Sequence, residues 1–405
     1  MEEREVGCQG ADGTARHFRD RCGRPQDAED EATAGQACSR PLSFGQHEME
    51  VAQMAKRKFR VGIVGCGGIA NTHATGWLTR KDEIEVVATC DVDIKRAREL
   101  AQKTGAREVL TDYRKLVALK DLDAVDICTP NMLHTPGVLA ALNAGKHVVC
   151  EKPLAVTTAE VRKMGMLADR KRLKLMTAQS TRWSQKSKAV KKFIAGGAIG
   201  TPIHARVYAL RRNLLPSWGV GFIDRKLSGG GPCMDIGVHA LDLCMWLTDF
   251  PKPVRVTGRS RVNFAMAHDI PGAWGEWDRK RFTVEDHAVG FVHFDNGMTM
   301  VLEASWLNHQ EANETMQNNI LGSKGGVEWP TLKYWSARNH VLYDAQIKEQ
   351  AGGLPAHTLE LLDFCDCVVN NKPSPVPWQE TIKVIAILEA IYSSESQRKE
   401  IRVKL

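Results

Sequence analysis

Two side chains that can move protons stand four residues apart in an apolar segment. Residues 229–246 read GGGPCMDIGVHALDLCMW, and a helical period aligns Asp235, His239 and Asp242 on one stripe. A carboxylate beside an imidazole suits general acid–base chemistry near neutral pH. The same pattern also fits an Asp that caps the helix and a histidine buried in the core. The segment alone leaves these interpretations open.

A second group of residues has the pattern of a phosphate-binding turn. The sequence VGIVGCGGIA contains Gly65-x-Gly67-x-x-Ala70 between an apolar run and a helical pattern. Such glycines allow a tight turn and the approach of a pyrophosphate, which the helix N-terminus attracts. Asp91 follows Gly65 by 26 residues, where a carboxylate binds ribose and repels a 2′-phosphate. We therefore expect NAD as the cofactor, although Arg96 argues against a strict preference over NADP. A plain strand–helix turn with a capping Asp is the alternative. The expected contacts of this turn are Gly65, Gly67, Gly68, Ile69 and Asp91.

Two further motifs, CTPNMLH and CEKP, follow strand-like runs. In doubly wound sheets ligands bind at the carboxyl ends of the strands, so we expect these motifs near the nicotinamide. An ordinary surface lysine is the alternative reading of Lys152. The cofactor-binding residues expected here are Thr129, Pro130, Asn131, His134, Glu151 and Lys152.

The elements around these motifs alternate between short apolar runs and helical patterns. This alternation predicts an α/β fold with a doubly wound parallel sheet. The helical patterns cover 94–104 and 135–144. The expected strands are 59–65, 85–91, 124–130, 147–153 and 173–179.

The pattern changes after residue 180. A helix is expected at 184–195, another at 233–248 and an amphipathic one at 378–393. Asn296-Gly297 lies between two strand patterns, which predicts a hairpin. The second half therefore predicts a mixed or antiparallel sheet. Its expected strands are 202–211, 253–263, 284–294 and 297–307.

Composition limits the possible functions. The chain has 405 residues, 43% hydrophobic and 25% charged residues and a net charge of +7. No apolar run is long enough to span a membrane, no secretory signal is recognisable, and no dense basic cluster favours nucleic acid. The eleven cysteines are scattered, several of them in apolar runs, which is typical of reduced thiols in a cytoplasmic protein.

Residues 1–55 differ from the rest of the chain. They hold six Arg, no Lys and eleven Asp or Glu, a net charge of −5, so the remainder carries +12. This stretch shows no regular periodicity, and we expect a disordered extension. Translation that starts at Met54 is one explanation, and a regulatory tail is the other.

Together, GIVGCGGIA, CTPNMLH and CEKPLAV resemble the glucose–fructose oxidoreductase / inositol dehydrogenase / MocA family. The resemblance covers about 56–405 and implies an N-terminal Rossmann domain at 56–179. It also implies a C-terminal α/β domain at 180–405, built on a large open, mostly antiparallel sheet through which members form homo-oligomers. The family's catalytic residues correspond to Lys152, Asp235 and His239. No third ligand near Asp235 and His239 favours a metal, so none is expected.

This resemblance implies an NAD-dependent dehydrogenase. Neutral His239 takes the hydroxyl proton, Lys152 stabilises the alkoxide and Asp235 orients His239 or binds a hydroxyl. The second half is most similar to bacterial sugar and glycoside dehydrogenases, which suggests oxidation at C3 of a pyranose. The expected substrate contacts are Arg182, Trp218, Asp235, His239, Trp274 and Trp277, since tryptophan faces suit sugars or flat aglycones. Packing in a loop core or an interface is the alternative for the tryptophans, and an exposed salt bridge for Arg182.

Three other functions remain open at this stage. They are an inositol dehydrogenase, a glycoside hydrolase that works by transient oxidation and elimination with bound NAD, and a non-enzymatic NAD-binding sensor. The presence of Lys152, Asp235 and His239 together argues against the sensor.

Overall fold

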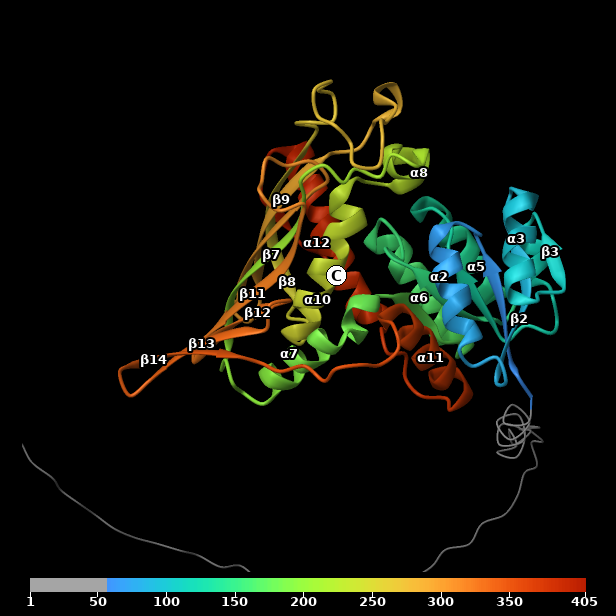
Figure 1. The fold of residues 1–405 in the computed structure, drawn as a ribbon, viewed down its shortest axis with the longest axis horizontal. Helices are drawn as coiled ribbons and strands as arrows, with labels where there is room; N and C mark the ends of the chain where they lie inside the picture. The colour runs from blue at the N-terminus through green and yellow to red at the C-terminus, as the bar shows by residue number, and fades with distance from the viewer. Residues whose placement is uncertain (1–56) are drawn as a thin grey trace, which may run out of the picture. The chain divides into compact units, whose positions relative to one another are not determined.

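The computed structural model describes residues 57–405, so the expected disorder of residues 1–55 lies outside the described part. The first sheet has six parallel strands in the order β3-β2-β1-β4-β5-β6 (Figure 1). The predicted doubly wound parallel sheet is confirmed. The sequence missed β3 because it is short and only partly buried. The strands are β1 (Phe59–Val64), β2 (Ile84–Cys90), β3 (Glu108–Leu110), β4 (Ala124–Ile127), β5 (His147–Glu151) and β6 (Leu175–Ala178).

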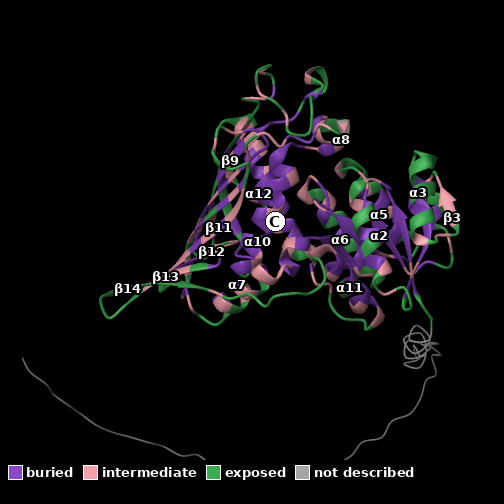
Figure 2. Ribbon diagram, viewed as in Figure 1, coloured by how far each residue is buried: buried purple, intermediate pink, exposed green. Residues whose placement is uncertain are grey.

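Helices cover this first sheet, and its strands are apolar because both faces are buried (Figure 2). Val61, Ile63 and Val125, for example, are 0% exposed. The helices of this part are α2 (Gly68–Leu78), α3 (Ile94–Thr104), α4 (Tyr113–Val117), α5 (His134–Asn143) and α6 (Thr158–Lys171).

The second sheet has nine strands in the order β14-β13-β12-β11-β7-β10-β9-β8-β15. Its neighbours pair antiparallel except for β7 and β10, which run parallel. The predicted hairpin joins β9 to β10, and Gly297 takes the left-handed conformation its turn needs (φ +84°). The strands are β7 (Pro202–Arg211), β8 (Pro253–Arg261), β9 (His287–Phe294), β10 (Thr299–Ser305), β11 (Glu314–Gly322), β12 (Gly325–Trp329), β13 (Lys333–Arg338), β14 (Val341–Gln346) and β15 (Ile401–Arg402).

Helices α7 (Gln185–Ala195), α10 (Val238–Leu247) and α12 (Trp378–Gln397) pack on or beside this second sheet (Figure 1). Helix α11 (Ala356–Val369) returns to the first sheet and packs on α2. Helix α11 and strands β11–β14 were not among the elements expected from the sequence. In β14 every residue is exposed, so the strand has no buried face to create an alternating pattern.

The remaining elements of the described residues are short helices and turns. No helix within residues 57–405 is long and apolar enough to cross a membrane. The short elements are α8 (Val220–Ile223), α9 (Arg225–Ser228), the 3₁₀ turns η1 (Asn131–Leu133), η2 (Ser180–Trp183) and η4 (Arg279–Arg281), and the π turn η3 (Cys233–Gly237).

Candidate active site

The segment that holds Asp235 and His239 begins with a π turn, η3, and continues as α10. Asp235 lies within the π turn and His239 in the first turn of α10. The sequence predicted a regular helix here, but the wider turn changes the direction of side chains. Such turns are frequent at functional sites. Behind both residues, Val238, Leu241 and Met245 are 0% exposed and fix the helix in the core.

A buried carboxylate holds the start of this segment. Glu285 accepts hydrogen bonds from the backbone N–H of Gly231 (3.0 Å) and of Cys233 (3.2 Å), and from the hydroxyl of Tyr392 (2.7 Å). Gly231 has no room for a side chain, since a Cβ atom there would lie 2.0 Å from the carbonyl oxygen of Glu285. The glycine-rich approach to η3 therefore serves close packing.

Lys152 reaches this segment from the end of β5. Its Nζ donates to the carbonyl oxygen of Asp235 at 2.9 Å and to Asp235 Oδ1 at 3.1 Å. The other carboxylate oxygen, Oδ2, accepts a hydrogen bond from Trp306 Nε1 at 3.1 Å and lies 4.0 Å from a guanidinium nitrogen of Arg211. Burial alone would raise the pKa of Asp235, but the charges of Lys152 and Arg211 hold it below its ordinary value. Asp235 is therefore ionised, and its carboxylate is fixed by two hydrogen-bond donors, Lys152 and Trp306, with Arg211 as a more distant cation.

His239 is half-buried beside this ion pair. Its Nδ1 is buried and has no hydrogen-bond partner among the described residues. Burial, and then the charge of Lys152, lower the pKa of His239 to about 3, against the opposing charges of Glu151 and Asp235. The imidazole is therefore neutral near pH 7 and able to accept a proton.

The glycine turn fits a dinucleotide. Gly65 has φ +87°, and a Cβ atom there would lie 2.6 Å from the carbonyl oxygen of Cys128. At Gly67 and Gly68 a Cβ atom would meet nothing within 4 Å, so the space above the turn is open. Among the described residues no side chain caps α2, which leaves its first N–H groups for phosphate. Asp91 accepts from the N–H of Cys66 (2.8 Å), which fixes its carboxylate beside the turn.

The other expected cofactor residues differ in what they face. Thr129 is half-buried at the end of β4, and its Oγ1 is buried without a partner among the described residues, which leaves it free for a ligand. Asn131 donates to the carbonyl oxygen of Ser228 at 2.8 Å. His134 is 1% exposed, and its ring nitrogens lie 2.7 Å and 2.8 Å from the carbonyl oxygens of Pro153 and Thr129. Both ring nitrogens of His134 therefore hold the two strand-end loops together. Pro130 is exposed, Ile69 is half-buried, and Glu151 is buried.

Two of the expected substrate contacts lie elsewhere. Arg182 is 3% exposed, and its guanidinium binds Asp242 through two 2.7 Å hydrogen bonds and Glu380 through a third. It therefore supports α10 through Asp242 and does not face a substrate. Trp277 is 4% exposed and donates its indole N–H to the carbonyl oxygen of Ala265 at 2.8 Å, so its ring packs in the core.

Trp218 and Trp274, by contrast, form an exposed aromatic pair. They are 61% and 39% exposed, and their ring centroids lie 4.4 Å apart in an edge-to-face arrangement. The guanidinium of Arg211 lies 5.3 Å from the ring centroid of Trp274. Because Arg211 also approaches Asp235, the aromatic pair is connected to the site through this one side chain.

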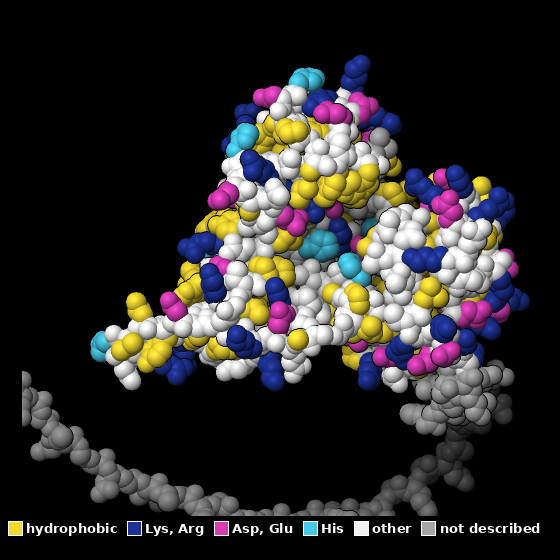
Figure 3. All heavy atoms as spheres, in the orientation of Figure 1, with side chains coloured by type: hydrophobic (Ala, Val, Ile, Leu, Met, Phe, Trp, Pro, Cys, Tyr) yellow, Lys and Arg dark blue, Asp and Glu magenta, His cyan; other side chains and the backbone are white. Residues whose placement is uncertain are grey.

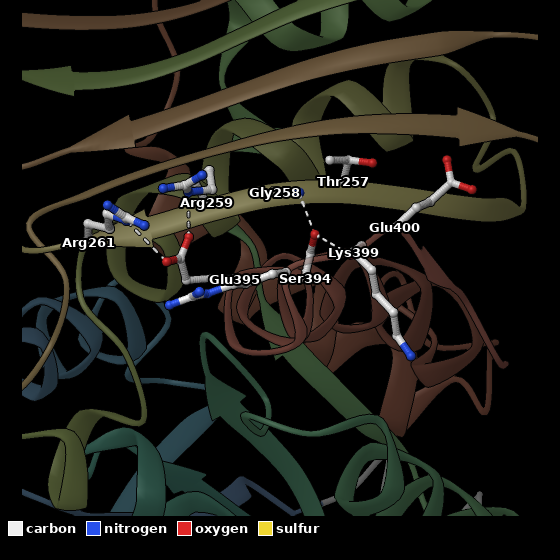
Figure 4. A pocket seen from close by; sticks show the side chains of 9 residues that line it. Thr257, Gly258, Arg259, Arg261, Ser394, Glu395, Lys399 and Glu400 are labelled. Atoms are coloured by element: carbon white, nitrogen blue, oxygen red, sulfur yellow. Dashed lines mark hydrogen bonds and ion pairs between the residues drawn. The ribbon is translucent and has the colours of Figure 1, made fainter.

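The surface is hollowed between the part built on the first sheet and the part built on the second, and histidine side chains are visible in the hollow (Figure 3). A separate cavity of about 460 Å³ lies at β8 and the end of α12 (Figure 4). None of the expected site residues lines it, and its Arg259 and Arg261 are paired with Glu395 at 2.7 Å and 3.1 Å. We therefore locate the candidate active site at Lys152, Asp235 and His239.

Comparison with known proteins assigns this chain to a family. Residues 59–179 match the Gfo/Idh/MocA oxidoreductase family with its NAD-binding Rossmann fold, and residues 187–328 match the Gfo/Idh/MocA C-terminal domain. The chain belongs to the Gfo/Idh/MocA oxidoreductase family. The expected NAD cofactor and the expected class, an NAD-dependent dehydrogenase, are confirmed.

Several members of the Gfo/Idh/MocA family are similar to the chain. D-glucoside 3-dehydrogenase of Escherichia coli is 34% identical over 275 residues, 68% of this chain and 78% of the relative. 1,5-Anhydro-D-fructose reductase of Ensifer adhaerens is 37% identical and covers 59% of this chain and 67% of the relative. The solved structure of levoglucosan dehydrogenase with NADH has a TM-score of 0.74 at 21% identity, covers 86% of this chain and 100% of its own, and supports the fold.

Two residues that contact the candidate site were not among the expected ones. Arg211 is the last residue of β7, and Trp306 directly follows β10. Both stand at the carboxyl ends of β7 and β10, the parallel pair of the second sheet, but the sequence pattern does not show that these two strands are neighbours. In the mostly antiparallel second sheet, only the tertiary structure brings them to Asp235.

Proposed function

We propose that this chain oxidises a secondary hydroxyl, at C3, of a pyranose sugar or glycoside with NAD. The observation that carries the proposal is the convergence of Lys152, Asp235 and neutral His239 at the carboxyl end of β5. The similarity to D-glucoside 3-dehydrogenase supports the substrate class and the carbon.

In this proposal NAD supplies the hydride acceptor. His239 takes the hydroxyl proton, because its imidazole is neutral and its Nδ1 has no hydrogen-bond partner among the described residues. Lys152 donates a hydrogen bond to the same oxygen and stabilises the developing alkoxide charge. Asp235 fixes Lys152 from one side and is itself fixed by Trp306. The three groups thus hold the hydroxyl in one orientation while its C–H bond faces the cofactor.

The exposed pair of Trp218 and Trp274 suits the apolar face of a pyranose or a flat aglycone. Arg211 lies between this pair and Asp235, where its guanidinium can donate to further hydroxyl groups of the sugar. A substrate that spans both places would be a glycoside, with its sugar at Asp235 and its aglycone at the tryptophans.

The test is a substrate panel of glucosides, free sugars and inositols with NAD, in which NADH formation is followed and products are identified by NMR. A 3-keto glycoside with one NADH per product is the expected result. Exclusive oxidation of inositols would show that the substrate is a cyclitol and not a sugar. Release of aglycone without net NADH would indicate hydrolysis through transient oxidation. NAD binding without turnover of any compound would favour the interpretation as a non-enzymatic NAD-binding sensor.

We further propose a cytoplasmic homo-oligomer formed through the second sheet. The outward side chains of β9 include Phe291, which is 38% exposed, and no helix of the described part covers that face in Figure 1. Light scattering on the full chain, with Phe291→Asp as the variant, tests this part separately. A monomeric wild type would contradict it.

A further inference from the structure

A buried group of ionisable side chains lies behind the candidate site and takes no part in the chemistry proposed above. His73 of α2 is 0% exposed, and its Nδ1 lies 3.0 Å from Asp126 Oδ2. Its Nε2 lies 3.0 Å from Glu151 Oε1, as an ion-pair contact outside the line of a hydrogen bond. Glu151 directly precedes Lys152 and accepts a hydrogen bond from its backbone N–H. The group therefore begins immediately beside the candidate catalytic lysine, where the charge of Glu151 also acts on His239.

The group continues to the surface through α11. Potential ligand atoms of His73, His357 and Glu360 all lie within 4.8 Å of one another. Glu360 Oε1 lies 3.2 Å from His357 Nδ1, while Oε2 is buried without a partner among the described residues. The side chain of His357 is 35% exposed. We name Glu151, His73, Glu360 and His357 the buried chain.

The charges of the buried chain differ along its length. Burial opposes the charge on His73, yet Asp126 and Cys128 raise its pKa well above the ordinary value. Burial also opposes the charge on Glu151, but His73 lowers its pKa to about 2. Burial raises the pKa of Glu360 to about 7, opposed by His73 and His357 and reinforced by Glu151. One member of the chain therefore exchanges its proton near neutral pH.

A metal site is the other function that these residue types suggest. A metal binds a neutral imidazole through a free nitrogen. Both nitrogens of His73 already face carboxylates, and these hold the ring protonated. The arrangement therefore favours protons over a metal ion.

We propose that the buried chain conducts the proton of the oxidised hydroxyl from His239 to solvent at His357, an inference that rests on the proposed function. When the C–H bond breaks, its electron pair leaves with the hydride, and the O–H proton passes to His239 as the C=O bond forms. His239 is already half-buried, and a bound substrate and cofactor would cover the rest, so the proton would then need another exit. Each residue of the buried chain passes one proton to the next, and His357 releases one to water. The four residues then return to their starting protonation states.

The outer half of the buried chain offers a test, because His357 is partly exposed and Gln keeps the size of the buried Glu360 side chain. We choose His357→Asn and Glu360→Gln, with His287→Asn as the matched control, because His287 is also a half-buried histidine paired with a glutamate (Glu303, 3.0 Å). We expect kcat to fall about tenfold in His357→Asn with KM unchanged, and added imidazole to restore it. The control should match the wild type. An unchanged kcat, or a loss that imidazole does not rescue, overturns the proton path.

A spectroscopic measurement tests the buried chain of ionisable residues without any substrate. Infrared spectra of the wild type should contain a protonated carboxyl band that weakens above about pH 7, since burial raises the pKa of Glu360 to about 7. Glu360→Gln should lack this band, and its absence from the wild type overturns the inference. If sugars are oxidised but both variants match the wild type, only the proton path fails. If the wild type oxidises nothing, the proposed function fails with it.

Discussion

Lys152 Nζ lies 3.1 Å from Asp235 Oδ1, although the two residues are 83 positions apart in the sequence and lie in segments that pack on different sheets. The lysine directly follows β5 of one sheet, and the aspartate lies in a π turn packed on the other. The ion pair is half-buried, with side-chain exposures of 17% for Lys152 and 13% for Asp235. A site that needs both residues is complete only when the two sheets are correctly packed.

Replacing Lys152 by Met should remove the hydrogen bond to the alkoxide and leave Asp235 without its main cation. We expect kcat to fall on the order of 10²- to 10³-fold, as for other groups that stabilise developing charge. The control is Lys191→Met, which removes another partly buried lysine paired with Asp249. Steady-state kinetics with the substrate found in the panel measure both variants, and equal activity of Lys152→Met and wild type would contradict the assignment.

Trp306→Phe should keep an aromatic side chain at this buried position and remove the N–H that binds Asp235 Oδ2. Loss of a hydrogen bond to a charged group costs about 1.5–3 kcal/mol, so we expect kcat/KM to fall at least about tenfold. Trp378→Phe is the control, because it removes an indole hydrogen bond to Asp169 (3.0 Å). If both variants lose activity equally, Trp306 does not act through Asp235.

The three glycines of the first turn should respond differently to alanine. Gly65→Ala adds a Cβ atom at positive φ against the backbone of Cys128, which should destabilise the fold by at least about 1–2 kcal/mol. Gly67→Ala and Gly68→Ala meet no protein atom, so their melting temperatures should match the wild type. We expect their NAD affinity to fall about tenfold or more, because the added methyl occupies the path of the pyrophosphate. Calorimetry and NAD titration separate the two effects, and unchanged affinity in all three variants would remove the turn from the cofactor site.

His239 makes the free energy of unfolding depend on pH. Burial and Lys152 lower its folded pKa to about 3, while the unfolded value stays near 6.5. Between these values the unfolded chain binds the extra proton, so this stabilising contribution is present above pH 6.5 and is lost as pH falls toward 3. The difference from His239→Asn should change by up to about 1.4 kcal/mol per pH unit in that window. Urea unfolding at several pH values measures it, and parallel curves for the two proteins would show that His239 is not held neutral.

Much of the first half could be predicted from local patterns. Continuous apolar runs gave the parallel strands because both faces of that sheet are buried, and the helix at 94–104 coincides with α3. In the second half, β7 was predicted at its observed bounds, whereas β11–β14 and α11 were missed. Strands with exposed or mixed faces carry no strong period, so their pairing depends on partners distant in the chain.

The sequence by itself determined the glycine turn, the acidic end of β2 and the residue types of the candidate site. Local chemistry suffices for these, since a turn at positive φ and a strand-end carboxylate are encoded within a few residues. The tertiary structure decided which of the polar residues meet. It turned Arg182 to Asp242, buried Trp277, and brought Arg211 and Trp306 to Asp235. The physical reason is that a contact across two sheets depends on packing and burial, and neither is visible in the spacing of residues along the chain.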